Sequence, residues 1–135
     1  MKRKTTNLMF SKKSDDHSTP PDFYAELHRE FKFTDDPCPL RGKVNGLTRA
    51  WGARAFVNPP YSNIRGFMDK AVQEIQHNRC KLAVFLVPAR TDTKWFHDVV
   101  LTNHAEVRFI RGRLKFGESK NSAPFPSILC IFRGA

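Results

Sequence analysis

The run Leu82-Ala83-Val84-Phe85-Leu86-Val87 constrains the fold of this chain more than any other segment. All of its residues are apolar and it stops at Pro88, without the alternation that marks a strand with one face in water. A strand of this kind is buried on both faces, as at the centre of a parallel sheet. Such a sheet needs helices on either side, so the run indicates an α/β protein.

Apolar residues recur at helical spacing on both sides of this strand. The clearest helix is predicted over residues 64–75, and a second over residues 93–101. Further strands are predicted at residues 33–35, 54–57, 106–110 and 128–132. This alternation is typical of a doubly wound α/β sheet, here mostly parallel and closed by a terminal antiparallel hairpin.

The chain has the length of one domain. Its first 18 residues are basic and polar, and we expect a flexible tail over residues 1–18 before a single compact domain over residues 19–135. The helix after this tail is predicted to begin with Thr19 as N-cap and a proline in its first turn, and to end near Lys32. With 40% hydrophobic residues, the domain can bury a real core.

The charge balance indicates the kind of partner. Lys and Arg number 23 against 13 Asp and Glu, a formal net charge of +10. This excess favours a polyanion, above all nucleic acid. A membrane surface or an acidic substrate would also attract it, but no lipidation signal or long amphipathic basic helix is present. No apolar run is long enough for a signal peptide or a bilayer span, so we expect a cytoplasmic protein.

Two patterns that would point to other chemistry are missing from the sequence. Cys38, Cys80 and Cys130 are far apart and form no C-x-x-C pair, so neither a zinc site nor a disulfide framework is indicated, and we expect no metal. The chain also lacks a G-x-G-x-x-G loop, which argues against a nucleotide-dependent dehydrogenase.

Three polar or proline-rich stretches follow predicted strands. They are Asp35-Asp36-Pro37-Cys38-Pro39, Asn58-Pro59-Pro60-Tyr61 and Pro88-Ala89-Arg90-Thr91-Asp92. In doubly wound sheets, ligands bind outside the carboxyl ends of the strands. We therefore expect these stretches to meet at one site.

The stretch beginning at Asn58 has a specific chemistry. Two prolines hold the backbone extended, because each fixes its own φ and biases the residue before it away from the helical region. The Asn58 side-chain oxygen and the Pro59 carbonyl are then two rigid acceptors, and Tyr61 offers a flat ring beside them. An exocyclic amine on a planar ring would bind such an arrangement. Holding both of its hydrogens out of plane would aim the nitrogen lone pair at an electrophilic methyl group.

These residues carry a resemblance. The N-P-P-Y motif resembles the motif of enzymes that methylate planar amines and amides. It lies within one of a series of blocks that occur in this order: Thr19-Pro20, FTDDPCPL (33–40), GLTRAW (46–51), FVNPPYS (56–62), VPARTDTKWFHD (87–98), FIRGRLKF (109–116) and APFPS (123–127). Together they resemble the phage-borne DNA N-6-adenine-methyltransferase family over about residues 17–133.

The resemblance implies a compact Rossmann-like fold that binds S-adenosyl-L-methionine and methylates adenine in DNA at the N6 amine. It implies catalytic roles for Asn58, Pro59, Pro60 and Tyr61 and cofactor binding at Thr19, Pro20, Asp36 and Cys38. The adenine would leave the duplex stack and rest on the Tyr61 ring. Contacts to DNA are expected from Arg90 at the cleft rim and from an extended basic ladder of Arg111, Arg113 and Lys115.

Other readings of the same residues stay open. The motif also suits a methyltransferase acting on RNA or on a protein glutamine, and the chain would also suit a nucleic-acid-binding remnant that has lost activity. Asp36 would serve equally as a turn-capping acid, and Asp35 competes with it for the cofactor. Asp92 is expected to cap the next helix, and the prolines of APFPS are expected to shape the backbone rather than touch substrate.

Overall fold

A computed structural model of the protein describes residues 18–39, 45–116 and 123–134. The predicted basic tail lies outside these residues except for Ser18. The helices and strands, in chain order, are α2 (Pro21–Phe31), β1 (Arg54–Val57), the 3-10 helix η1 (Tyr61–Asn63), α3 (Ile64–Gln76), β2 (Leu82–Pro88), the π-helix η2 (Phe96–Leu101), β3 (Glu106–Phe109) and β4 (Ser127–Arg133).

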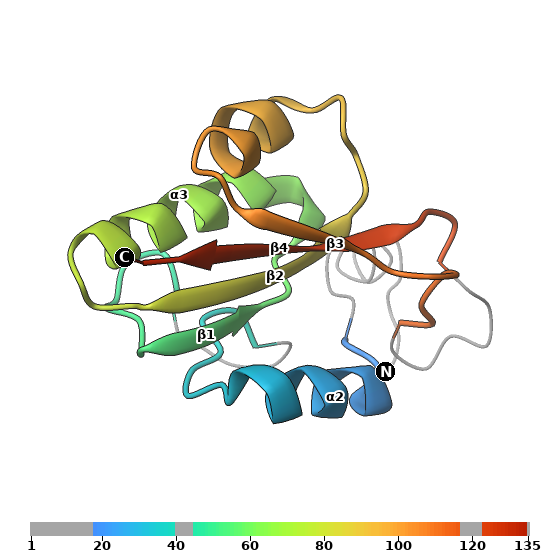
Figure 1. Cartoon of the computed structure of the whole chain (residues 1–135), viewed down its shortest axis with the longest axis horizontal. Helices are drawn as coiled ribbons and strands as arrows, with labels where there is room; N and C mark the ends of the chain where they lie inside the picture. Colours follow the sequence, from blue (N-terminus) through green and yellow to red (C-terminus); the bar gives the residue numbers. More distant parts are fainter. Residues whose placement is uncertain (1–17, 40–44, 117–122, 135) are drawn as a thin grey trace, which may run out of the picture.

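The four named strands form one sheet in the order β1-β2-β4-β3 (Figure 1). β1 and β2 pair in parallel, whereas β4 pairs antiparallel with both β2 and β3. The prediction of a mostly parallel sheet is therefore wrong, since the sheet is mixed. The reason is that β4 is inserted between two strands that share a direction, so its reversal makes both of its pairings antiparallel. The terminal antiparallel pair itself is confirmed.

The short strand expected at residues 33–35 is a single parallel bridge between Asp35 and Ala55. The Phe56 backbone N–H donates to the Asp35 carbonyl at 3.0 Å, which fixes this segment beside β1. Two acidic residues and Pro37 follow at once, and neither type favours continued pairing. The parallel register nevertheless places Asp36 level with Phe56, one residue before β1 ends at Val57.

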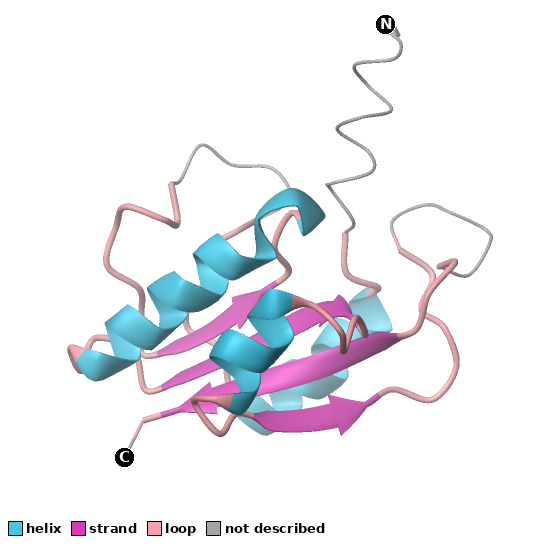
Figure 2. Ribbon diagram, turned by 90° about the horizontal axis from the view of Figure 1, so that it is seen from above, coloured by secondary structure: helices cyan, strands magenta, loops and turns pink. Residues whose placement is uncertain are grey.

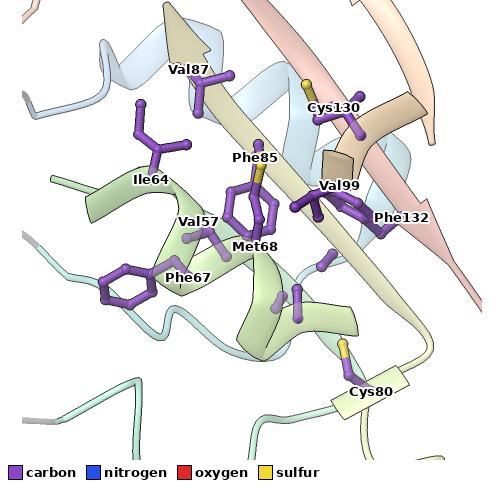
Figure 3. Close-up of a cluster of buried hydrophobic side chains, with 14 of the residues drawn as sticks. Val57, Ile64, Phe67, Met68, Cys80, Phe85, Val87, Val99, Cys130 and Phe132 are labelled. Carbon is purple, nitrogen blue, oxygen red and sulfur yellow. The ribbon is translucent and has the colours of Figure 1, made fainter. Parts of the chain in front are cut away.

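Helices cover both faces of the sheet, with α3 and η2 on one side and α2 on the other (Figures 1 and 2). Every residue of β2 is buried, as the apolar run predicts. The side chains of Phe85 and Val87 pack with Met68 of α3 on one face (Figure 3). On the other face, Leu86 packs in the cluster that contains Phe31 of α2. Within the described chain, no helix is long and apolar enough to cross a membrane.

The two longer helices match their predicted spans, but the start of α2 differs. Pro20 occupies the N-cap position and Pro21 the first turn, so Thr19 lies one residue too early to be the cap and the predicted N-cap is wrong. α3 begins as its periodicity predicts, and the Asn63 side chain accepts a hydrogen bond from the Gly66 backbone N–H at 3.1 Å.

A buried carboxylate at the inner face of α3 ties the loop before β1 to the helix. Glu74 is fully buried and accepts from the Trp51 backbone N–H at 2.7 Å, from Lys70 at 3.1 Å and from the Arg79 guanidinium. The hydrogen bonds from Arg79 outweigh the cost of burial and lower the pKa of Glu74 to about 2. The network therefore holds an ionised group inside the protein, and the helical periodicity gave no sign of it.

Candidate active site

The strand ends meet at one edge of the sheet, at the right of Figure 1. β1 ends at Val57 and β2 at Pro88, and the reversed strand β4 begins there because Ser127 pairs with Pro88. The Ala89 backbone N–H donates to the Pro126 carbonyl at 2.9 Å, which holds the segments on either side together. Asn58, Arg90 and Phe125 thus arrive at the same edge from three adjacent strands.

Asn58 is held by the segment that leads into α2, the helix on the face of the sheet opposite α3. Its amide nitrogen donates to the Thr19 hydroxyl at 3.1 Å. In this arrangement the Asn58 side chain is held at Nδ2, and Oδ1 is the end of the amide that can accept hydrogen bonds. The sequence predicts that Thr19 lies near the site, and the structure brings it directly to Asn58.

The two prolines make the turn after β1 rigid. The Pro59 side chain is fully buried, and Pro60 is extended with φ −61° and ψ 137°. The Pro60 carbonyl accepts from the Asn63 backbone N–H at 2.9 Å, so the chain turns immediately into η1. Asn58 and Tyr61 are therefore presented by a short segment with little conformational freedom.

Tyr61 is half-buried and belongs to a cluster with Phe125 and Arg90. The Tyr61 and Phe125 rings meet edge to face with centroids 5.5 Å apart. The Arg90 guanidinium carbon lies 5.9 Å from each ring centroid, within reach of a cation–π interaction. Burial raises the pKa of Tyr61 to about 12, so its phenol stays neutral at physiological pH.

Phe125 is the site residue that the sequence analysis missed. The pattern of APFPS predicts a backbone-shaping connection, and nothing in it shows which strand lies beside the one that it enters. The insertion of β4 next to β2 is what brings Phe125 to the Tyr61 ring. A phenylalanine between two prolines, directly before a buried strand, is the signal that was available.

The two neighbouring acids at the 35–36 bridge have different partners. Both oxygens of Asp35 accept hydrogen bonds from Arg49, at 2.8 and 2.9 Å, and the Gly52 backbone N–H donates to it at 2.9 Å. Burial alone would raise the pKa of Asp35, but these hydrogen bonds hold it below its usual value. Asp35 is thus a structural anchor for the loop before β1.

Asp36 is the exposed member of the pair, and its Oδ1 accepts from the Cys38 backbone N–H at 3.2 Å. Partial desolvation of its carboxyl raises the pKa of Asp36, and the nearby charge of Asp35 adds to the rise. The turn-capping role expected for Asp36 is present in this bond. Its second carboxylate oxygen has no hydrogen-bond partner within the described residues.

The predicted basic segment after β3 is exposed but is not a strand. Arg111, Arg113 and Lys115 are exposed, while Leu114 and Phe116 pack against the core on the α2 side. Gly112 has φ +73°, a left-handed conformation that breaks an extended ladder, so the regular basic ladder is wrong although the exposure of its cations is confirmed.

The helix that follows β2 begins differently from the prediction. The helix after β2 is capped by Thr93, whose hydroxyl accepts from the Phe96 backbone N–H at 3.3 Å, so the expected cap by Asp92 is wrong. Within residues 18–39, 45–116 and 123–134, no group of His, Cys, Asp and Glu side chains could hold a metal ion.

An N-P-P-Y turn at the strand ends of an α/β sheet is the feature that this chain shares with amino-methyltransferases, and comparison with known proteins narrows that class to one family. The profile of the DNA N-6-adenine-methyltransferase (Dam) family matches residues 6–134, and the chain belongs to this family.

Two phage proteins carry the same similarity. The DNA N-6-adenine-methyltransferase of Haemophilus phage HP1 is 32% identical over 127 residues; the match covers 81% of this chain and 72% of that protein. The protein of the same name from Escherichia phage T1 is 36% identical over 74 residues, which cover 53% of this chain and 30% of that protein. Both alignments support the resemblance found in the ordered motifs.

Proposed function

We propose that this protein transfers a methyl group from S-adenosyl-L-methionine to the N6 amine of an adenine in DNA. The observation that carries the proposal is the rigid presentation of Asn58 at the strand ends, with its amide oriented by Thr19. The names of the two phage relatives support the same reaction and the same substrate. The reaction would take place in the cytoplasm of a bacterial host.

The catalytic role falls to residues 58–61. Asn58 Oδ1 and the Pro59 carbonyl would accept the two hydrogens of the adenine amine, and the buried Pro59 and extended Pro60 keep these acceptors in place. Asn58 is neutral and binds the amine without acting as a strong base. Most of the rate enhancement would come from alignment, since methyl transfer needs no covalent intermediate on the protein.

The side chains at the neighbouring strand end suit the cofactor. Asp35 is occupied by Arg49 and Gly52, whereas Asp36 is exposed and retains an acceptor oxygen for ribose hydroxyls or an ammonium group. Thr19 bonds to Asn58 and Pro20 is the next residue in the chain, while Cys38 lies in the same turn as Asp36. When bound there, S-adenosyl-L-methionine would supply the electrophilic methyl group. A cationic partner would lower the raised pKa of Asp36.

The aromatic cluster suits a base taken out of the DNA stack. Tyr61 would stack on the adenine, and the edge of the Phe125 ring holds Tyr61 in place. Arg90 is exposed above both rings and would contact a phosphate next to the extruded nucleotide. Arg111, Arg113 and Lys115 would contact the backbone further away, which positions DNA without reading its sequence.

The same proposal includes a Rossmann-like methyltransferase fold. β1, β2 and β3 share one direction, because β2 and β3 both oppose β4 and β1 is parallel to β2. Helices cover both faces (Figure 2), and the candidate site residues follow the carboxyl ends of β1 and β2, where such folds bind ligands.

The test is transfer of labelled methyl from S-adenosyl-L-methionine to unmethylated DNA, with RNA and protein as parallel substrates, followed by nucleoside analysis. The proposal predicts N6-methyladenine in DNA and a higher melting temperature of the protein when the cofactor is added. Label in RNA or protein alone would assign a different substrate. No label together with no cofactor-induced shift would identify a non-catalytic nucleic-acid-binding remnant.

A further inference from the structure

Phe109 is the last residue of β3, and its ring is displayed to solvent. With 80% of its surface exposed, it stands apart from the other exposed large apolar side chains of the described chain, Leu101 at 46% and Leu47 at 37%. Single exposed apolar residues are common on proteins, so exposure alone says little. The position of Phe109 in the sheet is what gives it significance.

The strand register places Phe109 at the end of the sheet where the candidate active site lies, level with the carboxyl end of β2. Phe109 pairs with Ile128 of β4, and Ile128 pairs with Val87 near the end of β2. Three strand spacings, about 15 Å, separate β3 from β1, which ends at Val57 just before Asn58. Phe109 therefore lies beside the site rather than in it, at the distance where DNA flanking a bound nucleotide would pass.

The charges around Phe109 divide into two groups. The Arg108 guanidinium is already ion-paired within the protein, with Glu30 at 2.7 Å and with Glu106 at 2.6 Å. Arg111 and Arg113 are exposed, and neither forms an ion pair with any residue that the structure describes. The exposed ring is thus followed directly by cations available to an external anion.

We infer that Phe109 is a base-stacking residue of the DNA-binding surface, contacting the duplex beside the target adenine while Arg111 and Arg113 hold the backbone. The inference rests on the proposed function and extends it beyond the active site. Extruding a base costs stacking energy, and an apolar side chain inserted at the disturbed step offsets that cost. A phenylalanine ring offers a stacking face to any base.

The positive charge beside Phe109 favours DNA over a second copy of the chain as the partner that binds the surface formed by Phe109, Arg111 and Arg113. β3 is an edge strand, and edge strands can pair with each other between molecules. A symmetric pairing here would bring Arg111 and Arg113 of both copies together in a protein of net charge +10. Like charges oppose that contact, whereas DNA satisfies both the cations and the ring.

The experiment measures the dissociation constant for a duplex over a range of salt concentrations. Phe109→Ala should fold normally and raise the Kd about tenfold, with the slope of log Kd against log salt unchanged, because no ion contact is lost. Phe109→Trp should bind like the wild type. The control Leu101→Ala removes an exposed side chain at the end of η2, before β3 begins, and should leave the Kd unchanged.

The charge variant provides the contrasting signature. Arg111→Gln with Arg113→Gln should weaken binding and reduce the salt slope by about 2, one unit for each lost phosphate contact. Together with the unchanged slope of Phe109→Ala, this pattern would separate stacking from ion pairing.

Three outcomes would overturn the inference. If the wild type methylates DNA and Phe109→Ala binds with the wild-type Kd, Phe109 does not stack on bases, and the proposed function stands. If Phe109→Ala turns a dimer into a monomer without changing the Kd, the surface is an interface between copies. If the wild type neither binds nor methylates DNA, the proposed function fails and this inference fails with it.

Discussion

The side-chain amide of Asn58 donates to the hydroxyl of Thr19, which lies 39 residues earlier in the chain, across a distance of 3.1 Å. The bond joins the end of β1 to the residue before the Pro20 cap of α2, so it ties the layer of α2 to the strand ends. It also restrains the Asn58 side chain, because the amide is held at its nitrogen end. Thr19 is therefore a positioning residue for Asn58 in the proposed reaction.

Thr19→Val removes this hydroxyl while keeping the shape of the side chain. We predict that kcat falls about fivefold, since one hydrogen bond of about 1 kcal/mol no longer orients the amide, and that Thr19→Ser restores most of the rate. Steady-state kinetics with both substrates would measure it. A rise in KM for S-adenosyl-L-methionine with kcat unchanged would show that Thr19 binds the cofactor and does not position Asn58.

Tyr61 should act through its ring. Its pKa of about 12 keeps the phenol neutral, so no rise in rate from its ionisation is expected between about pH 7 and 10. We predict that Tyr61→Phe retains at least half of the wild-type rate, whereas Tyr61→Ala loses about 10- to 100-fold through lost stacking. Equal losses in the two variants would mean that the hydroxyl, and not the ring, carries the function.

Glu74 should govern stability rather than turnover. Glu74→Gln removes the charge that pairs with Arg79 and Lys70, and we predict a loss of about 3 kcal/mol in the free energy of unfolding at pH 7. Urea unfolding followed by fluorescence would measure it. The matched surface variant Asp69→Asn, whose side chain is half exposed beside Arg65, should cost less than about 1 kcal/mol.

The pH dependence of this loss has a definite sign. Glu74 has a pKa of about 2 in the folded protein against 4.5 ordinarily, so its stabilisation is fully present above the ordinary value. The stabilisation is lost as the pH falls from about 4.5 towards 2, and the gap between wild type and Glu74→Gln should close over that interval. A gap of the same size at pH 3 and pH 7 would contradict the assignment of an ionised Glu74.

The sequence predicts the elements of this fold better than their arrangement. The apolar run of β2 and the periodicity of α3 identify a buried strand and the helix that covers it. A strand buried on both faces is apolar throughout, whereas a helix buried on one face has apolar residues at helical spacing. The place of β4 between β2 and β3 leaves no such pattern, since strand order depends on contacts between distant segments. The sheet was therefore expected to be more parallel than it is.

The sequence likewise predicts some residues of the candidate site and not others. Asn58 and Tyr61 stand out because two prolines after a strand are chemically unusual, and Arg90 stands out because it follows the central strand. Phe125 was missed because its contact with Tyr61 depends on the strand order. Glu74 was missed because a charged residue in a helical pattern is normally placed on the solvent face, and only three partners from separate positions explain its burial.

The most direct test of the central claim compares wild type and Asn58→Ala in one assay of methyl transfer to DNA, with the unfolding transition and the Kd for DNA measured on both proteins. The account predicts N6-methyladenine from the wild type, none above background from Asn58→Ala, and similar folding and DNA affinity for the two. Full methylation by a folded Asn58→Ala protein would contradict the account, because the amine would then be bound by other groups.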